Sequence, residues 1–182
     1  MKAVFLDRDG VINEDYGYVH KWKDFKFCDG AIEGLNLLKS LDYLLIIITN
    51  QSGIDRGFFS ELEYQRLTEK YTKQLSKNGL NIDAIYHCPH HPNYSELKFK
   101  DCNCRKPKPG MIFKAVKEFN INLTKSIIIG DSERDIEAGK NAGIKQRFLI
   151  SSQKIFKNDN ILFTKSFPSL IECAKYISLR KK

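Results

Sequence analysis

The sequence predicts an α/β fold in which helices cover both faces of a parallel sheet. Short apolar segments of strand length alternate along the chain with longer segments of helical periodicity. Three of the expected strands end in polar side chains, at Asp7, Thr49 and Asp131. Because parallel strands bring their carboxyl ends to one edge of a sheet, these residues should share one crevice. We therefore expect a doubly wound, Rossmann-like sheet with a ligand site at that edge.

The expected strands are short, mostly apolar segments that are not long enough to be helices. They cover residues 2–6, 43–48, 83–86, 126–129 and 147–150. Continuous apolar runs of this length are typical of strands that are buried on both faces.

Helix signals lie between and after these strands. A helix should open at Asp29-Gly30, because apolar residues then recur at helical spacing up to Leu41. Ser60 and Glu63 form a capping-box pattern for a second helix that runs toward Ser76. The remaining helices are expected from Pro109 to Phe119, from Asp135 to Ala142 with Gly143 as the stop, and from Phe167 to Leu179.

The composition indicates one domain over residues 1–182, which is long enough to bury a core. No apolar run reaches the length of a membrane span, and the first strand leaves no room for a signal peptide, so we expect a cytoplasmic protein. The net charge of +8 comes mainly from scattered lysines, so nucleic acid is not an expected partner. We expect a monomer that acts on a small molecule.

The first strand runs into an acidic turn, Asp7-Arg8-Asp9-Gly10-Val11. Two carboxylates separated by one residue can serve one metal ion and one phosphorus centre together. An ordinary charged turn is the plainer interpretation, and Asp7, Thr49 or Asp131 alone could be a helix N-cap. Convergence of all three on one sheet edge favours an active site.

A second cluster combines cysteine and histidine. Cys88 and His90 are followed by Cys102 and Cys104, a spacing that fits a tetrahedral zinc ion held by three thiolates and one imidazole. Such a site has no open coordination position and is therefore structural. Buried free cysteines are the alternative, and from spacing alone His87 or His91 could replace His90. The odd total of five cysteines argues against a disulfide framework.

The acidic turn and three later motifs resemble the haloacid dehalogenase superfamily of phosphotransferases. The signature residues Asp7, Asp9, Gly10 and Val11 are followed by Thr49, by Lys106 before a helix, and by Gly130-Asp131. The resemblance implies that Asp7 attacks phosphorus to form an aspartyl-phosphate and that Asp9 is the general acid and base. It also implies that Asp7, Asp131 and the backbone carbonyl of Asp9 hold Mg²⁺, that Thr49 and Asn50 donate hydrogen bonds to the phosphoryl oxygens, and that Lys106 supplies fixed positive charge.

Within the superfamily, the chain resembles the zinc-looped members, which include heptose bisphosphate phosphatases and histidinol phosphatases. It carries Cys88-Pro89-His90 and Cys104-Arg105-Lys106-Pro107, which selects His90 as the zinc ligand. The stretches at residues 15–20 and 49–57 look like those of the D-glycero-D-manno-heptose 1,7-bisphosphate 7-phosphatases. This similarity implies Mg²⁺-dependent removal of the 7-phosphate during synthesis of nucleotide-heptose precursors of lipopolysaccharide or another surface glycan.

The same similarity implies a set of substrate-binding residues. Arg105 would grip the phosphate that is not cleaved, because a guanidinium can bind phosphate oxygens through two donors. The other members of the set are Asp15, Tyr16, Gly17, Tyr18, Asn50, Gln51, Ser52 and Ser132. Arg56 is interpreted as a surface arginine and is left out of the site.

No long insertion interrupts the chain, so we expect no large cap domain. The zinc loop, at about residues 88–104, would then cap the cleft. Alternative functions are a histidinol-phosphate or other small sugar-phosphate phosphatase, a catalytically silent binding protein, and a phosphatase of polynucleotide ends. The intact set of Asp7, Asp9, Thr49, Lys106 and Asp131 argues against a silent protein.

Overall fold

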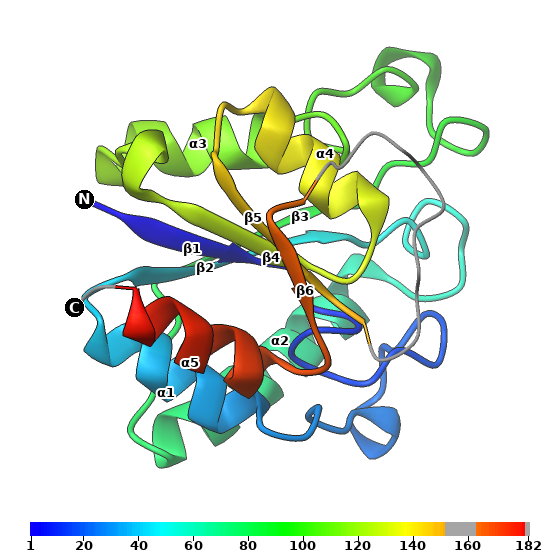
Figure 1. The fold of residues 1–182 in the computed structure, drawn as a ribbon. Helices are drawn as coiled ribbons and strands as arrows, with labels where there is room; N and C mark the ends of the chain where they lie inside the picture. The colour runs from blue at the N-terminus through cyan, green and yellow to red at the C-terminus, as the bar shows by residue number, and fades with distance from the viewer. Residues whose placement is uncertain (152–162, 181–182) are drawn as a thin grey trace.

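The computed structural model describes residues 1–151 and 163–180, which form a six-stranded parallel sheet covered by helices (Figure 1). The strands run in the order β3-β2-β1-β4-β5-β6, and every pairing is parallel. Their bounds are β1 Ala3–Leu6, β2 Leu44–Asn50, β3 Ala84–Cys88, β4 Ile127–Gly130, β5 Gln146–Ile150 and β6 Lys165–Phe167. This is the order of a doubly wound Rossmann-type sheet, which confirms the predicted fold class.

The strand order reverses direction between β1 and β4, and this switch point positions the site. Leu6 at the end of β1 pairs with Ile47 of β2 on one side and with Ile129 of β4 on the other. The residues that follow β1 and β4 therefore emerge side by side at the carboxyl edge of the sheet. Ligands bind at such switch points in open α/β sheets.

Helices cover both faces of the sheet (Figure 1). On one face lie α1 Ala31–Ser40, α2 Glu61–Lys77 and α5 Leu170–Leu179, and on the other lie α3 Gly110–Phe119 and α4 Glu133–Asn141. Short 3₁₀ turns cover Trp22–Asp24, Leu97–Phe99 and Leu123–Lys125. No helix in the described ranges is long and apolar enough to span a membrane.

Two hydrophobic cores, one on each face, explain the continuous apolar runs of the strands. Val4 and Leu6 of β1 pack into the core beneath α1, α2 and α5, whereas Ala3 and Phe5 pack into the core beneath α3 and α4. All four side chains are fully buried. A strand with helices on both faces has no solvent-facing side, so its sequence does not alternate.

Most predicted elements are present with small changes in their ends. The predicted capping box is confirmed, since the Glu63 backbone N–H donates to the Ser60 hydroxyl and the Glu63 carboxylate accepts from the Ser60 N–H. Helix α4 begins at Glu133, two residues before the predicted start. The helix predicted from Phe167 begins at Leu170, because Phe167 ends an unpredicted strand, β6.

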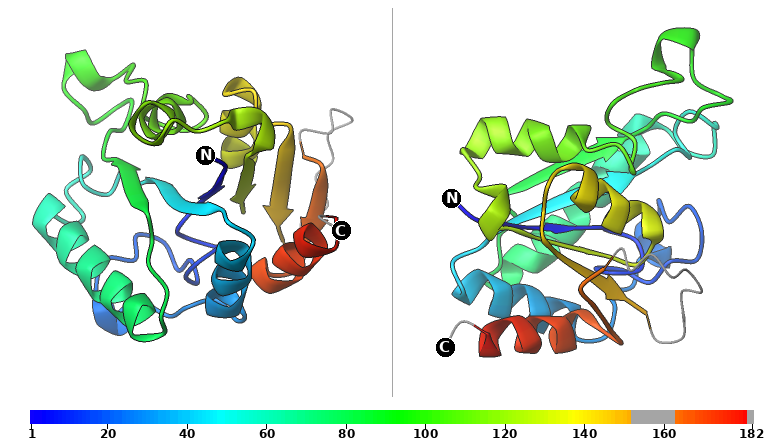
Figure 2. Two further views of the ribbon diagram at one scale, coloured as in Figure 1. Left: turned by 90° about the vertical axis from the view of Figure 1, so that its left-hand side faces the viewer. Right: turned by 45° about the horizontal axis from the view of Figure 1, so that its top comes forward.

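Among the described residues, three long loops rather than a large cap domain surround the carboxyl edge of the sheet. They are residues 7–30 after β1, residues 51–60 after β2, and residues 89–109 between β3 and α3. The third loop extends away from the body of the molecule (Figure 2). The first is fixed to α2 by aromatic packing, in which Phe25 stacks on Tyr71 with the ring centroids 5.3 Å apart.

Candidate active site

A cavity of about 570 Å³ opens at the switch point of the sheet. Most of the predicted site residues line it: Asp7, Asp9, Asp15, Gly17, Tyr18, Thr49, Asn50, Gln51, Ser52, Arg105, Lys106, Asp131 and Ser132. Tyr16 does not line it, and 67% of its surface is exposed to solvent. The unpredicted lining residues include Arg56, His91 and Asp135. The prediction that Arg56 lies outside the site is therefore wrong.

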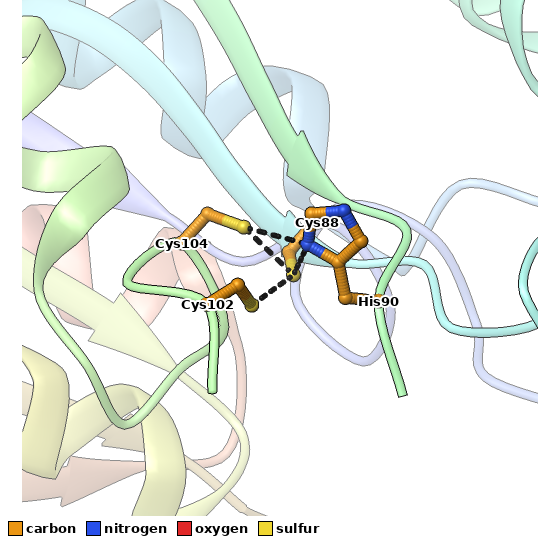
Figure 3. Close-up of side chains that lie close together, drawn as sticks. All are labelled: Cys88, His90, Cys102 and Cys104. Carbon is orange, nitrogen blue, oxygen red and sulfur yellow. Dashed lines mark hydrogen bonds between the residues drawn. The ribbon is translucent and has the colours of Figure 1, made fainter. Parts of the chain in front are cut away.

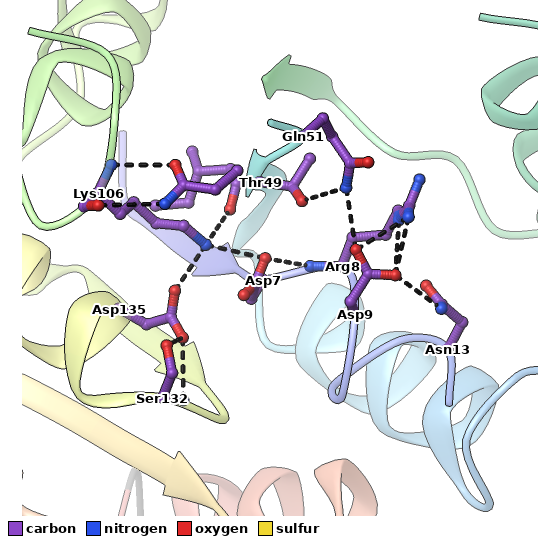
Figure 4. Close-up of polar contacts among 11 residues, drawn as sticks. Asp7, Arg8, Asp9, Asn13, Thr49, Gln51, Lys106, Ser132 and Asp135 are labelled. Carbon is purple, nitrogen blue, oxygen red and sulfur yellow. Dashed lines mark hydrogen bonds and ion pairs between the residues drawn. The ribbon is translucent and has the colours of Figure 1, made fainter. Parts of the chain in front are cut away.

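The floor of the cavity is a buried lysine between two carboxylates (Figure 4). Lys106 Nζ lies 2.8 Å from Asp7 Oδ1 and 2.6 Å from Asp135 Oδ1, and it donates to the backbone oxygen of Ile48 at 2.8 Å. These three contacts use all three ammonium protons. Asp7 Oδ1 also accepts from the Arg8 N–H at 2.7 Å, whereas Oδ2 has no hydrogen-bond donor among the described residues. Asp7 thus keeps one carboxylate oxygen available for chemistry.

Asp9 is held in one orientation by three side chains (Figure 4). Arg8 donates through Nη2 to both carboxylate oxygens, at 2.8 and 2.9 Å. Asn13 donates to Oδ1 and Gln51 to Oδ2, each at 2.9 Å. The Arg8 side chain is fully buried, and the Asp9 carboxylate beside it raises its pKa even though burial alone would lower it. Arg8, Asn13 and Gln51 therefore aim the group that is predicted to transfer protons.

Two predicted phosphate-binding residues come from the end of β2. Thr49 is buried and accepts a hydrogen bond from Gln51 at 2.9 Å. The Asn50 side chain holds the backbone of Lys106 at both ends: its oxygen accepts from the Lys106 N–H at 3.0 Å, and its nitrogen donates to the Lys106 carbonyl at 3.1 Å. Asn50 thus positions Lys106, a role that the sequence did not suggest.

Ser132 and Asp135 form a linked pair at the start of α4. The Ser132 N–H and hydroxyl both donate to Asp135 Oδ2, at 3.0 and 2.5 Å. Since Asp135 Oδ1 contacts Lys106, both of its carboxylate oxygens are engaged. From the sequence, Asp135 is expected only as the first residue of a helix, although the Asp131-x-x-x-Asp135 spacing on a strand-to-helix turn is a signal that could have indicated its role.

Next to the cavity, four side chains meet as a second cluster (Figure 3). The Cys88 sulfur lies 3.7 Å from both Cys102 Sγ and His90 Nδ1, and 3.1 Å from Cys104 Sγ. Zinc–sulfur bonds of about 2.3 Å place tetrahedral ligands about 3.7 Å apart, so a zinc ion fits this group. The close contact with the Cys88 sulfur lowers the pKa of Cys104 to about 5, and metal ions bind the thiolate form of cysteine.

The alternative histidines lie elsewhere. His87 Nε2 is 3.0 Å from Glu61 Oε1 of α2, and its ring packs on Tyr64. His91 faces the cavity instead, where partial burial and the charges of Arg105 and Arg56 lower its pKa. Because Cys88 pairs with Asn50 across β3 and β2, the cysteine cluster directly adjoins the cavity.

Comparisons with known proteins agree with this geometry. The haloacid dehalogenase-like hydrolase family matches residues 97–148. The chain is 49% identical over 158 residues to the D-glycero-beta-D-manno-heptose-1,7-bisphosphate 7-phosphatase of Pasteurella multocida, covering 87% of this chain and 86% of that protein. It is also 49% identical to the corresponding alpha-heptose 7-phosphatase of Photorhabdus laumondii, covering 84% of each chain. The chain belongs to the heptose-bisphosphate 7-phosphatase family of haloacid dehalogenase-like hydrolases.

A solved structure extends this similarity to three dimensions. The D,D-heptose 1,7-bisphosphate phosphatase of B. bronchiseptica, determined in complex with magnesium and phosphate, superimposes with a TM-score of 0.83. The two are 28% identical, and the match covers 100% of both chains. Our chain is accordingly a phosphoric monoester hydrolase with the fold of this family.

The acidic cluster of the phosphatase suits a hard cation. Oxygens of Asp7, Asp131 and Asp135 all lie within 4.8 Å of one another. Burial and the neighbouring Asp135 carboxylate raise the pKa of Asp7 well above its ordinary value, because Lys106 alone does not balance the negative charge. A divalent ion with oxygen ligands would supply the missing positive charge, so the residues fit Mg²⁺.

Gly10 allows the acidic turn to approach Asp131 closely. It has a φ of +77°, and a Cβ at this position would lie 2.2 Å from Asp131 Oδ2. Any larger residue would therefore push this carboxylate out of place and would also strain the backbone. The glycine of the signature is thus required by the geometry of the acidic cluster.

Proposed function

We propose that the chain is a Mg²⁺-dependent phosphatase that removes the 7-phosphate of D-glycero-D-manno-heptose 1,7-bisphosphate through an aspartyl-phosphate. The observation that carries this proposal is the position of Asp7 on the cavity floor. It lies 2.8 Å from Lys106 and within 4.8 Å of Asp131, in a chain 49% identical to enzymes named for this reaction. Phosphate monoesters hydrolyse very slowly in water, so a site needs both a nucleophile and charge neutralisation.

In the first half of the reaction, an Asp7 carboxylate oxygen attacks phosphorus and the bond from phosphorus to the sugar O7 breaks. Asp9, held by Arg8, Asn13 and Gln51, gives its proton to the departing O7. In the second half, Asp9 takes a proton from a water molecule that attacks the aspartyl-phosphate, which releases inorganic phosphate and restores Asp7. Thr49 and Lys106 stabilise the negative charge on the phosphoryl oxygens.

Asp7, Asp131 and the backbone carbonyl of Asp9 would hold the Mg²⁺ ion. When bound, this ion would neutralise charge on the transferring phosphoryl group. Asp135 has both oxygens engaged with Lys106 and Ser132, so we assign it to positioning these groups rather than to direct coordination.

The cysteine cluster would hold a structural Zn²⁺ through Cys88, His90, Cys102 and Cys104. Soft thiolate ligands select zinc over magnesium, so the two metal sites should not exchange ions. Zinc would hold the loop that carries Arg105, whose Nη1 donates to the backbone oxygen of His90 at 3.1 Å. Arg105 would contact the retained phosphate, and Gly17, Tyr18 and Ser52 would line the sugar.

The wider setting follows from the substrate. We propose a single-domain, monomeric enzyme that acts in the cytoplasm on a small phosphorylated sugar and that binds neither nucleic acid nor membranes. Its product would be a heptose 1-phosphate used for nucleotide-heptose precursors of lipopolysaccharide or another surface glycan.

Phosphate release from a substrate panel tests this function. The panel should contain both anomers of heptose 1,7-bisphosphate, because relatives are named for each, together with histidinol phosphate and common sugar monophosphates. We expect one heptose bisphosphate to give the highest kcat/KM and activity to require Mg²⁺. Faster turnover of histidinol phosphate would instead support the alternative function.

The Asp7→Asn variant provides the mechanistic control. It keeps the shape of the side chain but removes the attacking charge, so kcat should fall by several orders of magnitude while the melting temperature stays near that of the wild type. Wild-type turnover by this variant would rule out the aspartyl-phosphate.

A further inference from the structure

Arg56 lies in a cage of aromatic rings at the mouth of the cavity. Its guanidinium carbon is 5.3 Å from the Tyr18 ring centroid, 4.8 Å from that of Phe58 and 5.3 Å from that of Tyr94. The three rings come from three different loops, after β1, after β2 and after β3. Arg56 Nη1 also donates to the Tyr18 hydroxyl. The side chain is therefore fixed in position by segments far apart in the sequence.

This cage immobilises the charge of Arg56 without neutralising it. No carboxylate in the described ranges lies within ion-pair distance of Arg56, and its buried Nε has no hydrogen-bond partner there. The adjacent Asp55 carboxylate is turned away from Arg56 and accepts from the Ser95 hydroxyl and the His91 N–H. Aromatic faces attract a cation but leave its charge available to an anion.

Arg105 is a second arginine that lines the cavity and whose charge is not balanced by a carboxylate of the described residues. It donates to the His90 carbonyl and has no carboxylate partner among the described residues. By contrast, the acids on the cavity floor do have cationic partners: Asp7 and Asp135 contact Lys106, and Asp9 contacts Arg8. Two arginines without acidic partners that line one cavity indicate a bound anion.

We propose that Arg56 determines substrate specificity by binding, together with Arg105, the phosphate group that the enzyme does not remove. This inference rests on the proposed function, which supplies a substrate with two phosphates. Two guanidinium groups can bind separate oxygens of one phosphate, each through a pair of parallel hydrogen bonds. The cage reduces the entropy lost on binding because Arg56 is already held in place.

The test compares Arg56→Ala with the wild type on heptose 1,7-bisphosphate and on p-nitrophenyl phosphate, which has no second phosphate. We expect kcat/KM for the bisphosphate to fall about 10- to 100-fold, mostly through KM, as for loss of a hydrogen bond to a charged group. Turnover of p-nitrophenyl phosphate should change less than about 3-fold, because this substrate has no second phosphate for Arg56 to bind. For Arg56→Lys, kcat/KM for the bisphosphate should lie between the values of the wild type and of Arg56→Ala, because lysine keeps the charge but not the planar pair of donors.

Arg66→Ala is the matched control, since Arg66 is an exposed arginine on α2 outside the cavity. It removes the same charge and should leave both activities unchanged. If Arg66→Ala lowered bisphosphate turnover as much as Arg56→Ala does, the effect would be one of net charge and the proposal would fail. If Arg56 were only a clamp between loops, Arg56→Ala would impair both substrates equally, which would also overturn the proposal.

A competition experiment separates this inference from the proposed function. Fructose 1,6-bisphosphate and fructose 6-phosphate are tested as inhibitors of p-nitrophenyl phosphate hydrolysis by the wild type and by Arg56→Ala. We expect fructose 1,6-bisphosphate to inhibit the wild type more strongly than fructose 6-phosphate does. In Arg56→Ala this advantage of the bisphosphate should disappear. This result would support the role of Arg56 even if heptose bisphosphate proved a poor substrate, whereas an equal advantage in both proteins, or none in either, would overturn it.

Discussion

Arg8 is a fully buried arginine directly beneath the group that we assign as general acid and base. Burial of a guanidinium is costly unless a carboxylate and hydrogen bonds compensate for lost hydration. Here Asp9 and the Val19 carbonyl accept from Arg8, and the Tyr64 ring lies 5.9 Å from the guanidinium carbon. The planar arrangement of donors fixes both oxygens of Asp9 at once. We therefore propose that Arg8 positions Asp9 for proton transfer.

Arg8→Lys should separate charge from geometry at this position. Lysine keeps the positive charge but cannot donate to both Asp9 oxygens in the same plane, so Asp9 should lose its alignment. We expect kcat on a sugar phosphate to fall about 10- to 100-fold, a typical cost of small misplacements in active sites. Hydrolysis of p-nitrophenyl phosphate should fall less, because its leaving group needs no proton.

Arg66→Lys serves as the control for this exchange, and melting temperatures should be measured for both variants. Equal losses on the sugar phosphate and on p-nitrophenyl phosphate would show that Arg8 does not act through proton transfer. The sequence did not indicate this role, because arginine is seldom fully buried and nothing in the acidic turn distinguishes Arg8 from a surface residue.

At the scale of elements, the start of α4 connects helix capping to the active site. Ser132 precedes the helix and donates two hydrogen bonds to Asp135, and Asp135 in turn contacts Lys106. Ser60 at the start of α2 is a comparable cap that donates to Glu63, but Glu63 faces solvent and does not line the cavity. The two serines are therefore chemically similar caps with different connections.

Ser132→Ala and Ser60→Ala form a matched pair that tests this difference. Each should lower the free energy of unfolding by about 1 kcal/mol, the usual effect of removing a serine cap. Only Ser132→Ala should also raise the Mg²⁺ concentration for half-maximal activity, by about 10-fold, because groups that orient metal-site residues affect metal affinity. Chemical denaturation and magnesium titration measure the two effects. An unchanged magnesium titration for Ser132→Ala would show that Asp135 does not influence the metal site.

The prediction of elements succeeded where the hydrophobic core determines them and failed at the edge of the sheet. Strands β1, β2 and β4 are apolar runs buried on both faces, which gives them a clear signal. Strand β6 has only three residues, Lys165–Phe167, of which only Phe167 is buried, so a pattern based on hydrophobicity cannot reveal it. Strand β3 extends to Cys88 because pairing with β2 continues to Asn50.

At the scale of the whole molecule, Lys106 and Arg105 are held by different structures although they are adjacent in sequence. Lys106 is fixed by Asn50, Ile48, Asp7 and Asp135, all of which lie in or next to the sheet or α4. Arg105 contacts the His90 carbonyl, so its position depends on the loop that carries the cysteine cluster. The sequence alone could not distinguish how these two residues are held, because their anchors lie between 15 residues away, at His90, and 99 residues away, at Asp7.

The same reasoning explains which parts of the site could be predicted. The sequence predicts the cysteine cluster and the motifs around Asp7, Thr49, Lys106 and Asp131. Each of these consists of neighbouring residues at the end of an expected strand or in one loop, which makes it recognisable as a local pattern. Arg56 could not be assigned, because its cage is assembled from three loops whose relative positions depend on the fold. Residues that act through distant contacts leave no local pattern.

Loss of zinc should therefore impair binding of the retained phosphate more than the chemical step. Cys102→Ser removes one thiolate of the cluster and should lower the zinc content below the value of about one per chain expected for a closed structural site. The loop that carries Arg105 and Tyr94 should loosen, whereas Lys106 keeps its contacts with Asn50, Asp7 and Asp135. We expect kcat/KM for heptose 1,7-bisphosphate to fall at least about 10-fold, and kcat for p-nitrophenyl phosphate to change less than about 3-fold.

Cys28→Ser is the control for this experiment, because Cys28 is a partly buried cysteine outside the cluster. It should keep its zinc and both activities. Zinc content is measured by elemental analysis of protein dialysed against magnesium-free buffer, so that the two metals are distinguished. If Cys102→Ser lost zinc and lost both activities to the same extent, the position of Lys106 would depend on the loop, and its contacts with the sheet would be insufficient to hold it. If the wild type contained no zinc while fully active, the cluster would have no structural metal and the loop would be held by its thiol and imidazole contacts alone.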